Sequence, residues 1–563
     1  MFSALRSSIG AGGMTAASLR ADALAGLTVG IIALPLSMAL AIAVGVAPQH
    51  GLYTAIVGGI LIALTGGSRF NISGPTAAFV VILLPIVSAH GIGGLLVAGL
   101  MSGLILVGMG AARMGSLIAV MPYPVTVGFT AGIGTVIGLL QLKDLLGLEL
   151  PPSDPGFLAF LRALPGALPS LQLPELVVGL GTLAAVLGWQ RLRSRVPAHL
   201  IGLAAGVLLA WLLGILDPDA RIDTIGSRFA YTLGTASGQG IPPLPPQWIL
   251  PWTMPDASGQ PLGISVTLLV SLLPSALAIA MLGALESLLC ATVADGMTGT
   301  RHDPNDELIG QGIGNLLVPF LGGIPATAAL ARTAANIRAG AGSPLSAVVH
   351  GLFLLLALLV LAPALAVLPM ASMAALLLVV AWNMADVPHF LRILRVAPRE
   401  DAMTLVVCYA LTVLVNMEVA VGVGLGLAAF LFIRRTVALT DARLLERHAH
   451  PHAAALPAGV VLYDIDGPLF FGAAQKALSG LARLRGEVHA VVLEMRDVTM
   501  MDMTAIVALE SIVAELHARG IRLVASGLSP RIVGKLRHAG LDAQPGKLDF
   551  VPDIESAVEL LRS

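Results

Sequence analysis

The chain has 563 residues, of which 56% are hydrophobic and only 12% are charged, and its formal net charge is −1. Soluble domains carry about 25% charged residues, so this composition excludes an ordinary soluble protein and indicates an integral membrane protein. A nucleic-acid-binding protein is also excluded, because the sequence contains no large basic patch. The two cysteines, Cys290 and Cys408, lie in apolar runs, so no disulfide framework is expected.

Apolar segments long enough to cross a bilayer recur along the chain as far as Arg435. We expect fourteen spans, seven on either side of a polar, Pro- and Gly-rich loop at 217–263. An odd number of spans in each half inverts the second half relative to the first, so the sequence predicts an inverted repeat. The predicted spans are 22–45, 51–66, 74–90, 91–112, 121–141, 173–190, 197–216, 264–293, 307–322, 326–340, 344–363, 366–384, 402–417 and 419–433.

Arginine clusters predict which loops face the cytoplasm. Cytoplasmic loops carry an excess of Lys and Arg, and a cytoplasmic N-terminus places all three clusters on that side. Both termini are then inside and the 217–263 loop is outside. We expect no signal peptide, because no small-residue cleavage site follows Arg6 and Arg20. The clusters are Arg191, Arg193 and Arg195; Arg392, Arg395 and Arg399; and Arg434 and Arg435.

Two of the predicted spans are short and are interrupted by Gly and Pro. The first follows Gly74-Pro75, and the second follows Gly323-Ile324-Pro325. Each leaves room for roughly 14 helical residues, or about 21 Å, against a hydrocarbon core of about 30 Å. Each helix therefore begins inside the membrane, where its free N–H groups and positive dipole end are exposed. Paired interrupted helices in matching halves predict the binding site of a transporter, and their N-termini favour an anion.

After Arg435 the sequence changes to the pattern of a small α/β domain. Runs rich in β-forming residues at 460–464, 491–493 and 521–525 alternate with helical patterns. The predicted organisation is a cytoplasmic N-terminal segment at 1–21, a membrane domain at 22–436 with repeats at about 22–216 and 264–436, a linker at 437–456, and a cytoplasmic α/β domain at 457–563.

One loop of this domain, from Asp497 to Ala505, resembles the strand-to-helix loop of the STAS (sulfate transporter and anti-sigma-factor antagonist) domain. In soluble members of that family a serine after the aspartate accepts phosphate, whereas Met503 follows Asp502 here. A phosphorylation switch is therefore not expected, although Thr504 is nearby. The alternative is that Asp502 and Thr504 form a helix N-cap.

Further motifs lie in the membrane half. They are Pro48-Gln49-His50-Gly51-Leu52-Tyr53, Gly66-Gly67-Ser68-Arg69, Ser73-Gly74-Pro75 and Asn305-Asp306-Glu307-Leu308-Ile309-Gly310-Gln311-Gly312. Together with the trailing STAS domain, they resemble the sulfate permease (SulP, solute carrier 26) anion transporters over nearly the whole chain. Segments 283–290 and 295–300 resemble the aerobic four-carbon dicarboxylate transporter of enteric bacteria.

This resemblance implies a core domain, made of spans one to four and eight to eleven, that moves against a gate domain made of the remaining spans. Substrate would lie between the facing N-termini of the third and tenth spans. The resemblance also implies a homodimer in the bacterial inner membrane, with a STAS domain that a cytoplasmic partner could regulate. The fold class expected is thus an α-helical polytopic membrane protein with inverted repeats and a C-terminal STAS domain.

Glu286 is the only charged residue between Asp256 and Asp295, and it falls well inside the eighth predicted span. A charged residue at that depth costs about 2.5–3.5 kcal/mol on insertion scales. A proton-coupling carboxyl or the partner of a cation is therefore the functional interpretation. The structural alternative is an acid bonded to backbone N–H groups or to Arg332.

The candidate substrate-binding residues come from three helices. Thr76, Ala77 and Ala78 begin the first half-helix and would offer backbone N–H groups and a hydroxyl, unless water or protein groups satisfy these donors. By family resemblance, Ala329, Leu330 and Ala331 occupy the equivalent place in the second half-helix. Arg332 follows them, and its planar guanidinium either binds an anion or forms an ion pair that holds the core domain together. The resemblance also places Ser37 and Leu40, after Pro35 in the first span, toward the substrate.

These features favour a secondary active anion transporter that moves a dicarboxylate such as succinate, fumarate or aspartate, with proton symport through Glu286. The alternatives are a transporter or exchanger of bicarbonate or sulfate, an anion channel, and a sensor that signals through its STAS domain. No nucleophile–base pair, Walker motif or metal-ligand constellation is found. We therefore expect no enzymatic activity, no catalytic residue, no cofactor and no metal, and no nucleic-acid partner.

Overall fold

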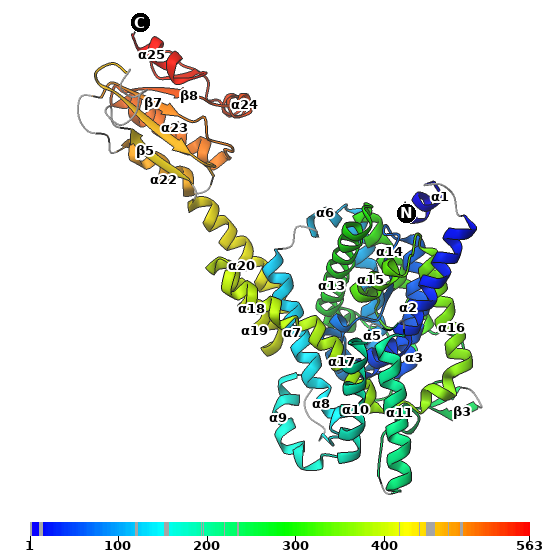
Figure 1. Ribbon diagram of the computed structural model, residues 1–563. Helices are drawn as coiled ribbons and strands as arrows, with labels where there is room; N and C mark the ends of the chain where they lie inside the picture. Colours follow the sequence, from blue (N-terminus) through cyan, green and yellow to red (C-terminus); the bar gives the residue numbers. More distant parts are fainter. Residues whose placement is uncertain are drawn as a thin grey trace. The chain divides into compact units, whose positions relative to one another are not determined.

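The computed structural model describes residues 3–10, 15–118, 122–150, 157–192, 194, 196–218, 220–233, 236–415, 417–438, 440–445, 456–470, 472–482, 484 and 488–562. They form two compact units, Met1–Leu425 and Gly426–Ser563. The first unit is almost entirely helical, and the second contains a five-stranded sheet (Figure 1).

Helices of the first half follow the predicted spans in order, and α2 begins ahead of its predicted start because Thr15 caps it by accepting from the Ser18 N–H. The elements are α1 (Ser3–Gly10), α2 (Ala16–Val44), α3 (Pro48–Tyr53), the π-helical turn η1 (Thr54–Gly58), α4 (Gly59–Thr65), β1 (Ser73–Gly74), α5 (Ala77–Ala111), α6 (Gly115–Ile118), α7 (Tyr123–Leu140), α8 (Leu142–Leu145), α9 (Phe157–Ala167), η2 (Leu168–Ser170), α10 (Leu173–Gln190) and α11 (Ala198–Leu216).

The second half repeats this arrangement after a loop that holds a β-hairpin. Its elements are α12 (Ile225–Arg228), β2 (Ala230–Leu233), β3 (Ala236–Gln239), η3 (Pro251–Thr253), α13 (Val266–Thr298), α14 (Pro304–Leu317), η4 (Val318–Leu321), β4 (Thr327–Ala328), α15 (Leu330–Arg338), α16 (Leu345–Ala366), α17 (Met370–Ala385), α18 (Val387–Val396), α19 (Arg399–Leu414) and α20 (Met417–Ala438).

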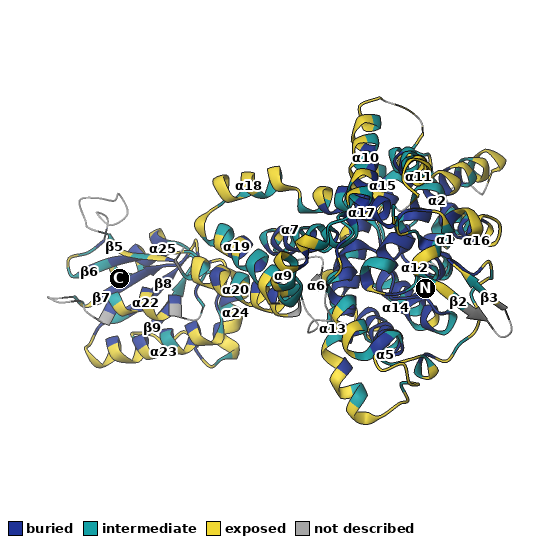
Figure 2. Cartoon of the chain, turned by 90° about the horizontal axis from the view of Figure 1, so that it is seen from below, coloured by how far each residue is buried: buried dark blue, intermediate teal, exposed yellow. Residues whose placement is uncertain are grey.

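Every predicted span contains a helix or a group of short helices. In the described ranges, nine helices are long and apolar enough to cross a membrane. The sequence did not reveal α9 or α18, which lie between spans. All described side chains of α18 are at least partly exposed (Figure 2), as expected for a short amphipathic helix outside the bundle.

Helix packing divides the bundle into two groups, as the resemblance implied. In the first, α2 packs on α16, and α5 packs on α13 and α14, with α15 against α2 and α13. In the second, α7 packs on α17 and α19, and α10 packs on α11 and α17. We call these groups the core and the gate. Contacts between α5 and α7, and between α2 and α17, join them.

The third and fourth predicted spans both lie in α5, and the non-helical backbone of Gly91 divides α5 into two helices at the predicted boundary between the spans. This glycine has a φ of 67°, in the left-handed region that other residues rarely adopt. A Cβ placed there would lie 2.3 Å from the carbonyl carbon of Asp256, so the backbone of the loop before α13 approaches it directly. The bend therefore depends on glycine in two independent ways.

We expect Gly91→Ala to destabilise the protein by more than about 2 kcal/mol, because it combines left-handed strain with a backbone clash. Gly108→Ala is the matched control on the same helix, since its Cβ would meet nothing within 4 Å. Thermal unfolding of the two purified variants in detergent gives the comparison. Equal melting temperatures would contradict the role assigned to Gly91.

The second half-helix is shorter than predicted. We expected helix over 326–340, but Thr327 and Ala328 are extended and form β4, and α15 begins only at Leu330. The reason is that β4 pairs with β1, so these residues direct their backbone hydrogen bonds to another chain segment. An apolar sequence run does not distinguish a two-residue strand from the first turn of a helix.

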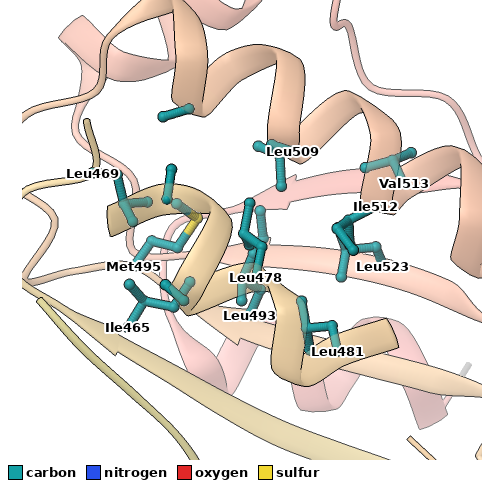
Figure 3. Close-up of a cluster of buried hydrophobic side chains, with 14 of the residues drawn as sticks. Ile465, Leu469, Leu478, Leu481, Leu493, Met495, Leu509, Ile512, Val513 and Leu523 are labelled. Carbon is teal, nitrogen blue, oxygen red and sulfur yellow. The ribbon is translucent and has the colours of Figure 1, made fainter. Parts of the chain in front are cut away.

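The C-terminal unit has the α/β alternation that the sequence predicts. Its strands lie in the order β5-β6-β7-β8-β9, with β5 antiparallel to β6 and the other neighbours parallel. Leu478 and Leu481 on a helix face Leu493 and Leu523 on strands (Figure 3), in one apolar core. The elements are β5 (Asp441–Leu445), β6 (Val460–Asp466), α22 (Gly472–Ala482), β7 (Ala490–Glu494), α23 (Met503–Ala518), β8 (Arg522–Ser526), α24 (Pro530–His538), β9 (Leu548–Val551) and α25 (Ile554–Arg562).

The loop before α23 carries the N-cap that the sequence suggested. Asp502 accepts a hydrogen bond from the Ala505 N–H at 2.8 Å, the geometry of a capping carboxylate. Met503 is 63% exposed at the first position of the helix, where a phosphorylatable serine would stand. Most of the predicted linker, 446–455, lies outside the described residues.

Candidate functional site

The two half-helices begin next to each other, on either side of a short antiparallel pairing. Ser73 pairs with Ala328 and Gly74 with Thr327, and the Ala329 N–H donates to the Ile72 carbonyl at 2.9 Å. Because the strands run in opposite directions and each leads into its helix, α5 and α15 leave the pair toward opposite sides of the membrane. Their positive ends therefore adjoin, as the paired interrupted spans predicted.

Buried polar side chains fix this pairing from the neighbouring helices. Asn315 of α14 binds Ala326 twice, donating to its carbonyl at 2.9 Å and accepting from its N–H at 2.7 Å. Gln311 donates to the Ser73 hydroxyl at 3.1 Å, and Ser287 of α13 contacts the Thr327 hydroxyl at 2.9 Å. Non-helical backbone at membrane depth is tolerated when its polar groups are satisfied in this way.

A cavity of about 140 Å³ opens beside the start of α5, between the core and the gate. Ala78 is the residue of the half-helix α5 that lines the cavity, and Glu286 and Thr292 line it from α13. The gate contributes residues of α7 and Met384 of α17. Its complete lining is Ala78, Thr126, Phe129, Thr130, Leu282, Leu285, Glu286, Leu288, Leu289, Thr292 and Met384.

Glu286 and the first half-helix are in direct contact. The Thr76 hydroxyl, at the N-cap of α5, donates to Glu286 Oε2 at 2.9 Å. Thr76 therefore does not cap its own helix, and Ala329 does not cap α15. The first-turn N–H groups of both helices thus have no capping side chain, which is the arrangement of an anion site. Within the described structure Glu286 makes no ion pair with Arg332, so that structural alternative is not observed.

Arg332 lies against the paired strands and is 4% exposed. Its Nη1 has no hydrogen-bond partner among the described residues, and a Cβ at Gly74 would lie only 2.8 Å from this nitrogen. The guanidinium therefore occupies the space that the glycine leaves beside β1. A buried cation beside two helix N-termini adds to the positive potential that attracts an anion.

Gly74→Ala is expected to displace the Arg332 guanidinium and to lower anion uptake by about tenfold, or 1.4 kcal/mol. The control is Gly283→Ala on α13, whose Cβ would approach Phe79 Cζ no closer than 3.4 Å, an ordinary contact. Uptake rates normalised to the amount of folded protein provide the measurement. Wild-type uptake by the Gly74 variant would show that the position of Arg332 is unimportant.

A second buried acid, Glu307 of α14, holds the loop that leads into β1. Its Oε2 accepts from the N–H groups of Gly67 and Ser68 at 3.0 and 2.9 Å, and its Oε1 accepts from Asn71 Nδ2 at 2.7 Å. Glu307 is 1% exposed, so these bonds are shielded from water. The sequence showed Glu307 only as part of a family motif, and the structure gives it a physical role.

The other predicted site residues are divided between the cavity and its surroundings. Ala78 lines the cavity and Ala77 is buried next to it in sequence, whereas Leu330 and Ala331 are exposed and do not line it. Ser37 and Leu40 are buried in α2 and are also absent from the lining; the Ser37 hydroxyl has no hydrogen-bond partner among the described residues. Their roles in binding remain predictions.

Sequence reasoning missed the gate side of the cavity. Thr126 and Thr130 lie four residues apart in α7, so they share one face of the helix. This spacing was visible in the sequence, but a threonine pair in an apolar span is common. Nothing in the sequence showed which helix of the second group faces Glu286.

The fold and the cavity define a multi-pass membrane transport protein with paired intramembrane helix N-termini. Family models match the sulfate permease family over residues 19–408 and the STAS domain over residues 453–557. The chain therefore belongs to the sulfate permease family of anion transporters and carries a C-terminal STAS domain.

Individual relatives are similar over most of their length. The chain is 38% identical to the putative sulfate transporter YvdB of Bacillus subtilis, over 94% of this chain and 95% of the relative. It is 30% identical to the bicarbonate transporter BicA of Picosynechococcus, over 92% and 91%. The resemblance to a dicarboxylate transporter is not supported by these relatives, which are named for sulfate and bicarbonate.

A solved structure confirms the fold class. Murine solute carrier 26 family member A9, an anion transporter in the inward-facing state, aligns with a TM-score of 0.84 at 17% identity, over 99% of this chain and 93% of the other. At this identity the likeness concerns the fold alone. The predicted inverted helical bundle with a C-terminal STAS domain is thus confirmed.

Proposed function

We propose that the protein moves a small inorganic oxyanion, of the bicarbonate or sulfate type, across the bacterial inner membrane as a secondary active transporter. The observation that carries the proposal is the cavity at the start of α5, where Ala78 and Glu286 line a common space. The names of the relatives support an inorganic substrate over a dicarboxylate.

The polarity of the cavity also favours a small anion. Its volume is about 140 Å³. The half-helix, Glu286 and three threonines supply polar groups, and the remaining lining is apolar or aromatic. A four-carbon dicarboxylate would need a second cationic or N–H-rich end, and no Lys or Arg lines this cavity.

Glu286 would couple anion binding to a proton. An ionised carboxylate repels an anion bound at the same helix end, whereas a protonated carboxyl can donate a hydrogen bond to it. Bicarbonate carries its own O–H and can donate to an ionised Glu286, but sulfate cannot. A sulfate transporter built on this site should therefore need the proton more strongly than a bicarbonate transporter.

The position of the cavity supports movement of the core against the gate. Its walls come from α5 and α13 on one side and from α7 and α17 on the other. A substrate held by the core would lose its gate contacts when the two groups slide, which is the geometry of an elevator-like cycle. Dimer formation and regulation through the STAS domain are further parts of this proposal, taken from the family resemblance.

The test is uptake of labelled bicarbonate, sulfate and fumarate into liposomes that contain the purified full-length protein. We expect saturable uptake of bicarbonate or sulfate that the other inorganic anion inhibits, and no fumarate uptake above that of empty liposomes. Saturable fumarate uptake would restore the dicarboxylate interpretation. Large unsaturated anion currents in a planar bilayer would instead indicate a channel.

A further inference from the structure

A second, more polar cavity lies within the gate, away from the anion site. It has a volume of about 380 Å³ and opens where α8 and the loop after it meet the start of α10 and the segment before α12. The predicted orientation places this end of the gate outside the cytoplasm. Its lining is Lys143, Asp144, Gly147, Leu148, Glu149, Leu150, Gln172, Glu175, Arg221, Asp223, Arg228 and Met370.

Glu175 is the buried group in this cavity. It stands in the first turn of α10, is 2% exposed, and its Oε1 accepts from the Asp223 N–H. Its Oε2 is shielded from solvent and has no hydrogen-bond partner among the described residues. Leaving such an acceptor unsatisfied costs about 1–3 kcal/mol, more for a charged group, so this oxygen needs a partner.

The cavity wall is built closely around this carboxyl. Gly147, with a φ of 60°, brings the loop after α8 against it, and a Cβ there would lie 2.9 Å from Glu175 Cγ and 3.0 Å from Gln172 Cβ. The opposite wall is tied to α17, because the Met370 N–H donates to the Asp223 carbonyl at 2.8 Å. The position of Glu175 is therefore determined from both sides.

The charges around the cavity indicate the sign of the missing partner. Asp144 and Arg228 form an ion pair and cancel. With Glu175 ionised, the other charged lining residues are the acids Glu149, Glu175 and Asp223 and the bases Lys143 and Arg221, a balance of 3 − 2 that leaves one negative charge. One monovalent cation would neutralise it.

We propose that this cavity binds a monovalent alkali cation, with Glu175 Oε2 as its principal protein ligand. Carboxylate and amide oxygens are the ligands that hard cations prefer, and such ions keep part of their water shell. Among the described residues, no three His, Cys, Asp or Glu side chains converge as a metal site, so water must complete the coordination. The bound cation would hold α8, α10 and the segment before α12 together.

The experiment is thermal unfolding of the full-length protein in detergent, titrated with NaCl or KCl against choline chloride at constant ionic strength. We expect a saturable rise of roughly 3 °C in the melting temperature for the wild type. Glu149→Asp, which keeps the charge of an exposed acid of the same cavity, should keep the rise, and Glu175→Gln should abolish it. No rise in the wild type, or the same rise in the Glu175 variant, would overturn the proposal.

Lys143→Gln provides a test that does not depend on the folding of a Glu175 variant. Lys143 forms no ion pair within the described structure, so its removal takes away a positive charge beside the cavity. A cation should then bind several-fold more tightly and saturate at a lower salt concentration. Weaker binding, or stabilisation by choline sulfate that Lys143→Gln abolishes, would show that the ligand is an anion and would overturn the proposal.

Discussion

Replacing Glu286 with Gln is expected to abolish the stimulation of uptake by an inward-directed proton gradient. The amide is nearly isosteric and can still accept from the Thr76 hydroxyl, whose oxygen lies 2.9 Å from Glu286 Oε2, but it cannot bind or release a proton. Uptake driven by the anion gradient alone should persist, because the first-turn N–H groups of α5 are unchanged. The stimulation should fall by at least about tenfold, which corresponds to 1.4 kcal/mol.

Thr76→Val is the companion variant for this test. It removes the hydroxyl that holds Glu286 in place and leaves the carboxyl itself, so proton-driven uptake should be reduced but retained. The measurement is initial uptake into liposomes with an acidic outside and a neutral inside, compared with equal pH on both sides. Undiminished proton stimulation in Glu286→Gln would contradict the coupling role.

Truncating Glu307 to Ala is expected to cause the largest loss of stability among single substitutions in the core. Three donors, the N–H groups of Gly67 and Ser68 and Asn71 Nδ2, would lose their acceptor in a buried environment. Each orphaned donor costs about 1–3 kcal/mol, so a total of about 3 kcal/mol or more is expected. The loop before β1 would then be free to move, and transport should fail with it.

A short series of variants shows whether the loss of stability comes from the hydrogen bonds of Glu307 or from a general sensitivity of the helical bundle to substitution. Glu307→Gln keeps one acceptor oxygen and should lie between the wild type and Glu307→Ala in melting temperature. Glu510→Ala, which removes an exposed acid on α23, should leave the melting temperature unchanged. A Glu307→Ala variant that melts with the wild type would show that the three hydrogen bonds contribute nothing.

The bundle was predictable because bilayer thickness fixes the length of each apolar run. Span counting gave the inverted repeat, and Gly-Pro interruptions located both half-helices. The predicted start of α15 was wrong, because Thr327 and Ala328 are extended where we expected helix. Their extended conformation depends on pairing with β1, a segment far away in the sequence. Such a pairing leaves no periodic pattern in either segment.

The candidate site was predictable in part. Glu286 was identified because it is the only charged residue in a long apolar segment. Its hydrogen bond with Thr76 was not predictable, because it depends on how α13 packs on α5, which no local sequence pattern shows. The opposing wall, with Thr126 and Thr130, was missed for the same reason. The dicarboxylate substrate is not supported by the relatives, because short segments similar to a dicarboxylate transporter carry less information than the whole chain.

Protection of an engineered cysteine by substrate tests most directly that the anion binds in the cavity beside α5. Both native cysteines are buried and, unlike Ala78, neither lines the cavity, so the wild type should resist a charged methanethiosulfonate reagent. Ala78→Cys should be modified and lose uptake, and bicarbonate or sulfate at saturating concentration should slow this loss by about tenfold. Ser88→Cys, exposed on the same helix, should show no protection. Modification of Ala78→Cys at the same rate with and without both anions would contradict the proposed site.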